Sequence, residues 1–204
     1  AAVMVVVLNA CVLFLVGCAM IGSKERLKVW WRQRVAGEVG YLSRDGFVWP
    51  WLAIGAGVGY ALLAGEALGL SSNKLSLHEW NLGFAALLFL DILIFIIRDI
   101  TFLQWCAMTR MKRPIFKGFL YLTLYYVAVA IIGSVMSLAS ETAGGSVMGL
   151  FSPWQMMGAH ETGLAHVQAS YVGIALQAVF SAFLVTLIAR RLSRPPVLVP
   201  ATST

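Results

Sequence analysis

The stretch LDILIFIIRDITFLQW, residues 90–105, places Asp91 deep in an apolar run that also holds Arg98 and Asp99. A membrane-spanning helix needs about 20 mainly apolar residues, and this part of the chain supplies them. A charge at the bilayer centre costs roughly 2.5–3.5 kcal/mol on insertion scales, so Asp91 must face protein or water. The stretch therefore predicts a transmembrane helix that packs inside a bundle.

The rest of the chain has the same apolar character. Of its 204 residues, 60% are hydrophobic and only 12% are charged, and the mean hydropathy is +0.83. Soluble domains carry roughly 25% charged residues, about twice this fraction. We predict an all-α, polytopic transmembrane helix bundle that forms a single domain over 1–194, with a cytoplasmic tail at 195–204. The apolar blocks predict five spans, at about 1–22, 47–70, 80–99, 118–138 and 168–189.

The positive charges orient these predicted spans. The segments 23–46 and 98–117 and the tail from 190 hold every Lys and Arg of the chain except Lys74. Basic residues accumulate on the cytoplasmic side of membrane proteins, so that side is predicted to be cytoplasmic. The C-terminus is then cytoplasmic, and residue 1 lies on the outer side. The net charge of +6 thus reflects membrane topology, and no nucleic-acid partner is predicted.

Segment 24–42, KERLKVWWRQRVAGEVGYL, is predicted to form an amphipathic helix. Apolar residues recur in it every four positions from Leu27 to Val39, with basic residues on the other faces. Basic helices that contain Trp lie along the headgroup boundary of a membrane. The helix is either an interfacial anchor or a coupling element that touches a cytoplasmic partner. The residues expected to make that contact are Arg26, Lys28, Trp31 and Arg32.

Two GxxxG pairs occur in the second apolar block. Small residues at this spacing let helix backbones approach closely, so we expect tight packing, either within the chain or across a dimer. The residues concerned are Gly55, Gly59, Gly65 and Gly69.

The three intramembrane charges share one helical face, because Arg98 and Asp99 follow Asp91 by seven and eight residues. The rise from Asp91 to Arg98 is about 10 Å, too long for an ion pair within the helix. Asp91 therefore needs a partner on another helix, water or a proton. It either borders a substrate path or proton relay, or makes a helix–helix contact, which we favour because no second acid or histidine lies at membrane depth. The expected partners are Gln177, Thr123 and Tyr125.

Arg98 and Asp99 themselves are expected at the inner membrane boundary. There a long side chain reaches the headgroups at little cost, and the pair would fix the turn into the cytoplasmic loop.

The segment 139–167 is too long for a simple turn and too apolar for a hydrophilic loop. We predict a re-entrant or interfacial helical segment on the outer side, shielded by protein. Its apolar side chains either line a hydrophobic substrate route or form a cap that rests on the membrane. These side chains are Phe151, Trp154, Met156 and Met157.

No motif predicts catalysis or metal binding. His160, Glu161 and His166 form H-E-x4-H, which lacks the H-E-x-x-H spacing that places two ligands on one helical face. We therefore expect neither an enzyme nor a cofactor, with contacts to pigment or lipid as the alternative.

Four stretches occur in an informative order: IIRDITFLQW, TRMKRPIFKGFLYLTLYY, LFSPWQMM and LQAVFSAFLVTLIARRLSR. Together they resemble the membrane (permease) subunits of type-2 ABC transporters, particularly poorly characterised bacterial ones, over about 90–194. The resemblance implies an inner-membrane protein of six spans; if the first span is missing here, the five predicted spans are the second to the sixth. It places a coupling helix in 23–46 and an outer helical insertion in 139–167.

The function implied by the resemblance is export of a hydrophobic or lipid-like substrate. Such a permease needs a dimer mate and a separate cytoplasmic ATPase, and its Asp91, Arg98 and Asp99 would support the translocation face. A second hypothesis is an accessory or scaffolding subunit of a large respiratory or photosynthetic membrane complex. Seven tryptophans and the lack of catalytic motifs fit that alternative.

Overall fold

The computed structural model describes residues 2–40, 46–47, 51–61, 82–109, 111–139, 150–151 and 164–193. Over these ranges the regular structure is helical throughout and contains no strand, in agreement with the predicted all-α class. A short helix, Trp51–Ala61, lies between the second and third of the labelled helices in the sequence. The labelled helices are α1 (Ala2–Ala19), α2 (Lys24–Val35), α4 (Leu82–Ala107), α5 (Pro114–Ala139) and α8 (Leu164–Leu192).

Two of these helices are long and apolar enough to cross a membrane. They are Pro114–Leu138 in α5 and Tyr171–Leu192 in α8, and a third candidate arises if α1 and α2 are one span broken by an 89° bend. Only 11% of the α5 span and 28% of the α8 span are buried inside the protein. Exposed apolar surface on this scale identifies a membrane protein, because soluble proteins rarely expose apolar patches of this size. The count of five spans stays a prediction.

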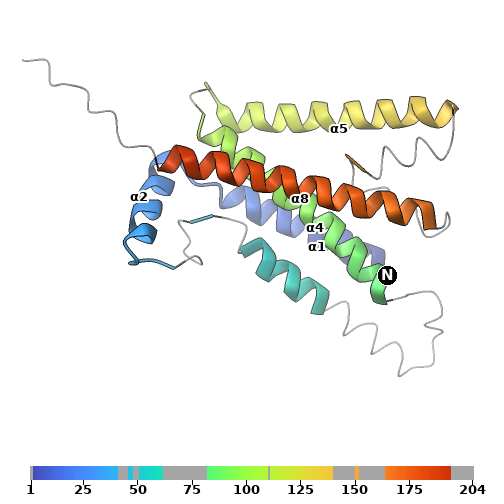
Figure 1. The fold of residues 1–204 in the computed structure, drawn as a ribbon, viewed down its shortest axis with the longest axis horizontal. Coiled ribbons are helices and arrows are strands. Elements are labelled where there is room, and N and C mark those ends of the chain that lie inside the picture. The colour runs from blue at the N-terminus through green and yellow to red at the C-terminus, as the bar shows by residue number, and fades with distance from the viewer. Residues whose placement is uncertain are drawn as a thin grey trace, which may run out of the picture.

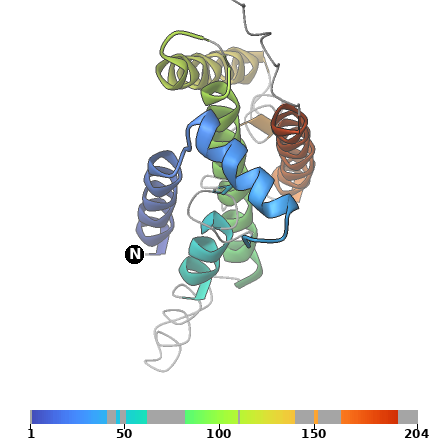
Figure 2. The ribbon, with the colours of Figure 1, turned by 90° about the vertical axis from the view of Figure 1, so that its left-hand side faces the viewer.

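Helix α4 occupies the centre of the arrangement. It contacts α1, α5 and α8, and α5 runs back in the opposite direction at a clear angle to it (Figure 1). Viewed from the end, α1, α5, α8 and Trp51–Ala61 surround α4 (Figure 2). One face of α4, formed by Ile92, Ile96, Ile100 and Leu103, packs into an apolar cluster with residues of α1 and Trp51–Ala61.

The short helix Trp51–Ala61 approaches α1 closely through its glycines. A Cβ atom on Gly55 would lie 2.5 Å from a methyl carbon of Leu13, and one on Gly59 would overlap the amide of Asn9. Gly57, two residues away on the opposite face, meets nothing within 4 Å. The first GxxxG pair thus faces another helix of the same chain, whereas Gly65 and Gly69 lie outside the described residues.

An elbow joins α1 to α2. The side chain of Ser23 caps α2 by accepting a hydrogen bond from the Arg26 amide at 3.4 Å. Gln104 of α4 holds the elbow from inside: its Oε1 accepts from the Gly22 amide and its Nε2 donates to the Gly22 carbonyl, both at 3.1 Å. The elbow is therefore fastened to the central helix by a pair of buried hydrogen bonds.

The amphipathic helix is shorter than the predicted 24–42. It ends at Val35, because Gly37 takes a positive φ of 79° and the Glu38 amide bonds the Gln33 carbonyl at 2.9 Å. Glycine at this position closes helices in this way. Leu27 and Trp30 are its buried residues, whereas Val35 is 73% exposed, so the apolar face differs from the predicted four-residue series.

The loop predicted between the third and fourth spans, 100–117, is also shorter in the structure. Helix α4 continues to Ala107, and α5 begins at Pro114, a residue suited to the first turn of a helix. Ile100 and Leu103 carry the apolar face of α4 past Asp99, which explains why the charged pair does not end the helix.

The glycine contact gives a first prediction. Replacing Gly59 by Leu forces a side chain into Asn9 of α1 and should lower the free energy of unfolding by about 1–3 kcal/mol. The matched Gly57→Leu change points into open space and should leave stability unchanged or slightly raised, since Leu favours helix over Gly. Thermal unfolding of both variants in detergent measures the difference. Equal transition temperatures would contradict the close approach of the two helices.

Candidate functional site

The side chain of Arg98 is 5% exposed and uses all of its nitrogen atoms in hydrogen bonds. Its Nε donates to Asp99 Oδ1 at 2.8 Å, and its Nη2 lies 2.6 Å from the same oxygen. Nη2 also donates to the Tyr126 hydroxyl at 2.9 Å. Nη1 donates to the Tyr125 hydroxyl at 3.0 Å and to Gln177 Oε1 at 2.9 Å. We call Arg98, Asp99, Tyr125, Tyr126 and Gln177 the Arg98 network.

The partners of Arg98 are held in turn by further bonds. The Tyr126 hydroxyl donates to Asp99 Oδ2 at 2.7 Å. The Tyr125 hydroxyl donates to the Phe151 carbonyl at 2.9 Å, and Gln177 Nε2 donates to the Leu150 carbonyl at 3.0 Å. The network therefore ties three helices and the segment 150–151 together.

Aromatic rings complete the surroundings of the guanidinium. Its central carbon lies 4.8 Å from the ring centre of Phe95 and 4.7 Å from that of Tyr125. Cations are attracted to aromatic faces at this distance. Charge, hydrogen bonds and ring contacts thus all stabilise a buried Arg98 whose charge Asp99 neutralises.

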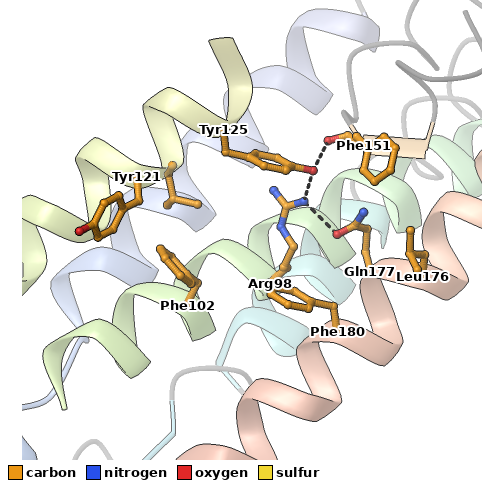
Figure 3. A pocket seen from close by; sticks show the side chains of 9 residues that line it. Arg98, Phe102, Tyr121, Tyr125, Phe151, Leu176, Gln177 and Phe180 are labelled. Carbon is orange, nitrogen blue, oxygen red and sulfur yellow. Dashed lines mark hydrogen bonds between the residues drawn. The ribbon is translucent and has the colours of Figure 1, made fainter. Parts of the chain in front are cut away.

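A cavity of about 340 Å³ adjoins the network between α4, α5 and α8 (Figure 3). Ligand pockets in proteins commonly hold 300–1,000 Å³, so this volume suits a small or slender ligand. Its described lining is largely apolar and consists of Arg98, Phe102, Tyr121, Leu122, Tyr125, Phe151, Leu176, Gln177 and Phe180.

Asp91 lies on the same face of α4, two turns before Arg98, and is only 1% exposed. Neither of its carboxylate oxygens has a hydrogen-bond partner in the part of the chain that the structure describes. Buried polar groups normally make hydrogen bonds. Asp91 is an exception to this rule among the described side chains of α4.

The structure corrects two expectations about these charges. Gln177 and Tyr125 bond Arg98, not Asp91, and the Thr123 hydroxyl bonds the carbonyl of Phe119 on its own helix at 3.0 Å. The side chains of Arg98 and Asp99 do not extend outward from the bundle, and α4 does not end at them. They lie nine and eight residues before the end of α4, inside the bundle, because neighbouring helices supply their partners.

The four residues expected at a coupling contact lie together on α2, which crosses the end of the bundle (Figure 2). Arg26 and Arg32 are exposed, and Lys28 and Trp31 are half-buried. The helix is held by Leu27 and Trp30, which form an apolar cluster with residues of α8 and the end of α4.

Other predicted features fall largely outside the described residues. Trp154, Met156, Met157, His160 and Glu161 are among them, whereas Phe151 lines the cavity. His166 belongs to the first turn of α8. Over the described ranges no group of three His, Cys, Asp or Glu residues is placed to hold a metal ion.

Two residues of the site were not singled out from the sequence. Tyr126 bonds both members of the Arg98–Asp99 pair, and Gln104 fastens the elbow. Each of these two residues is a polar group in an apolar helix. Because such a group needs a partner inside the protein, this could have marked both residues as candidates.

Comparisons with known proteins found no related protein. The chain matches no protein-family model, and searches of characterised proteins and of solved structures gave no significant match.

The Arg98 network gives a second prediction. Arg98→Met leaves Asp99 buried without its cation and should lower the free energy of unfolding by about 3–5 kcal/mol. Adding Asp99→Leu should recover part of this loss, because the unpaired charge is then removed as well. Arg191→Met is a control: Arg191 makes a 3.3 Å bond to the Met108 carbonyl and lies over Trp105, contacts worth about 1 kcal/mol. Unfolding in detergent compares the variants, and additive losses in the double variant would contradict the pairing.

The unbonded carboxylate gives a third prediction. Asp91→Leu removes a buried polar group that has no described partner and should raise the free energy of unfolding by about 1–3 kcal/mol. Asp99→Leu is the matched comparison and should lower stability, because it removes the partner of Arg98. Thermal unfolding of the two variants is the measurement. A loss for Asp91→Leu as large as that for Asp99→Leu would reveal a bond to Asp91.

Proposed function

We propose that this chain is the permease subunit of an ABC-type exporter, which moves a hydrophobic or lipid-like substrate with a separate ATPase. The observation that carries the proposal is the position of α2. This basic helix lies across one end of the bundle, bound to the ends of the long helices on one side and exposed on the other. A motor protein that drives such a permease needs a contact of this kind.

The inner side of α2 is buried against the bundle. Leu27 and Trp30 are 0% and 1% exposed and pack with Ile188 and Leu192 of α8 and with Met108. Movement of α2 would therefore displace the end of α8. The outer side offers Arg26 and Arg32, which suit an acidic surface on a partner.

A second connection runs from α2 to the Arg98 network. Gln104 fastens the elbow before α2 to α4, and Arg98 lies six residues earlier on that helix. Six residues of helix span about 9 Å. A displacement of α2 would thus be transmitted through Gln104 and one short stretch of α4 to the cavity beside Arg98.

The charge distribution supports the membrane orientation that we propose. α2, the start of α5 and the end of α8 meet at one end of the bundle (Figure 1). These segments, together with Lys112 and Arg113 just before α5, contain the described basic residues other than Arg98. With that end in the cytoplasm of a bacterium, the inner membrane would hold five spans, the C-terminus inside and residue 1 outside.

A dimer mate is part of the proposal. The face of α5 is widely exposed, with Leu138, Phe116 and Val135 at 88%, 68% and 60%. Lipid covers such a face in an isolated subunit, and a second subunit would cover part of it in a transporter.

The alternative is a scaffolding subunit of a larger membrane complex. The observation that favours it is the closure of the Arg98 network, in which the donors of the guanidinium are all used within the protein. A residue with no donor to spare holds helices together and does no chemistry.

Purification tests the proposal. The native protein, taken from its membrane in gentle detergent, should bring along a stoichiometric P-loop ATPase, identified by mass spectrometry. Pigment-bearing or redox subunits in its place would support the scaffold.

Charge reversal on α2 gives a fourth prediction. Lys28→Glu with Arg32→Glu should reduce the copurified ATPase at least tenfold, because like charges then face the partner. Lys117→Glu in the exposed first turn of α5 is the control and should retain the ATPase. A double variant that binds as much ATPase as the native protein would rule out α2 as the coupling contact.

A further inference from the structure

The Arg98 guanidinium, the charged group that lines the cavity, has no donor left for an anionic ligand. Arg98 donates to Asp99, Tyr125, Tyr126 and Gln177, and Asp99 neutralises its charge. Tyr125 and Gln177 donate onward to the carbonyls of segment 150–151. An anionic headgroup here would have to break these bonds, whereas a hydrocarbon would leave them intact.

The remaining described lining is aromatic or aliphatic and reaches the surface of the bundle. Tyr121 of α5 and Leu176 and Phe180 of α8 line the cavity and are also 47%, 45% and 43% exposed. The cavity therefore opens between the two helices that qualify as membrane spans. In the membrane orientation proposed above, the medium outside this opening is the hydrocarbon of the bilayer, so an occupant would enter sideways from the membrane.

We infer that this cavity binds one acyl chain of a membrane lipid, inserted from the bilayer between α5 and α8 with its hydrocarbon against Phe102. The inference rests on the proposed function in that it makes a membrane lipid the substrate class, and it deepens that proposal. The lipid headgroup remains outside, among the exposed residues of the two helices. The Arg98 network forms the closed inner wall of the site.

Photocrosslinking in a bilayer tests the site directly. The protein is reconstituted into vesicles of phosphatidylethanolamine and phosphatidylglycerol that contain a phospholipid with a diazirine in one acyl chain. After illumination, mass spectrometry locates the labelled residues. We expect labelling at Phe102 and Leu122, which are half-buried, as well as on the outer faces of α5 and α8.

Two opposite variants at one position sharpen the test. Leu176→Trp fills the opening and should lower labelling at Phe102 several-fold, whereas Leu176→Ala widens the opening and should raise it. Val179→Trp is the control, since Val179 lies on α8 at 69% exposure and does not line the cavity. It should leave labelling at Phe102 unchanged.

Labelling of the native protein confined to outward-facing residues such as Val179 would overturn the inference, whatever the variants do. Equal labelling at Phe102 in both Leu176 variants would do the same, because it would show that the chain does not enter there. The outcome does not depend on the ATPase: an acyl chain in the cavity without a copurified ATPase supports the site and counts against the exporter. A copurified ATPase with an unlabelled cavity supports the exporter and counts against the acyl-chain site.

Discussion

The ion pair of Arg98 and Asp99 sets the constraint on which the bundle depends. A guanidinium inside a membrane protein must have its donors satisfied by the protein itself, because no water is available in the hydrocarbon. Asp99 satisfies two nitrogens from the same helix, and the remaining bonds need side chains of α5 and α8. Three helices therefore have one mutual arrangement in which this charge is stable, and the cavity lies beside it.

The interior of the bundle around Arg98 and the end where α2 lies are held together by different kinds of interaction. Around Arg98 the helices are joined by directional bonds, which fix their rotation as well as their distance. At the end where α2 lies, the contact is an apolar cluster around Leu27 and Trp30, whose strength depends on buried area and not on angle. Gln104 adds two directional bonds there, at the elbow. An apolar contact with one fixed point permits a helix to pivot while it remains attached.

Hydropathy was enough to predict that the chain is helical. The features that depend on contacts between distant segments of the chain could not be predicted. The all-helical class follows from apolar blocks of helical length. A helix was also predicted in 24–42, but its end and its apolar face differ in the structure. The end of α4 was misplaced because Arg98 and Asp99 were interpreted as boundary charges. Nothing local to IIRDITF shows that Tyr125, Tyr126 and Gln177 lie within bonding distance. The cavity could not be predicted either, since its lining comes from three helices and segment 150–151.

The charged middle of α4 has a consequence for biosynthesis. This helix precedes α5 and α8 in the chain, so Asp91, Arg98 and Asp99 leave the ribosome before the residues that bond Arg98 have been made. A helix with three charges partitions poorly into lipid alone, at roughly 2.5–3.5 kcal/mol for each charge near the centre. The bonds that satisfy Arg98 can therefore form only after Tyr125, Tyr126 and finally Gln177 have been made. Helix α8, which follows α4 and α5 in the chain, thus completes the surroundings of the central helix.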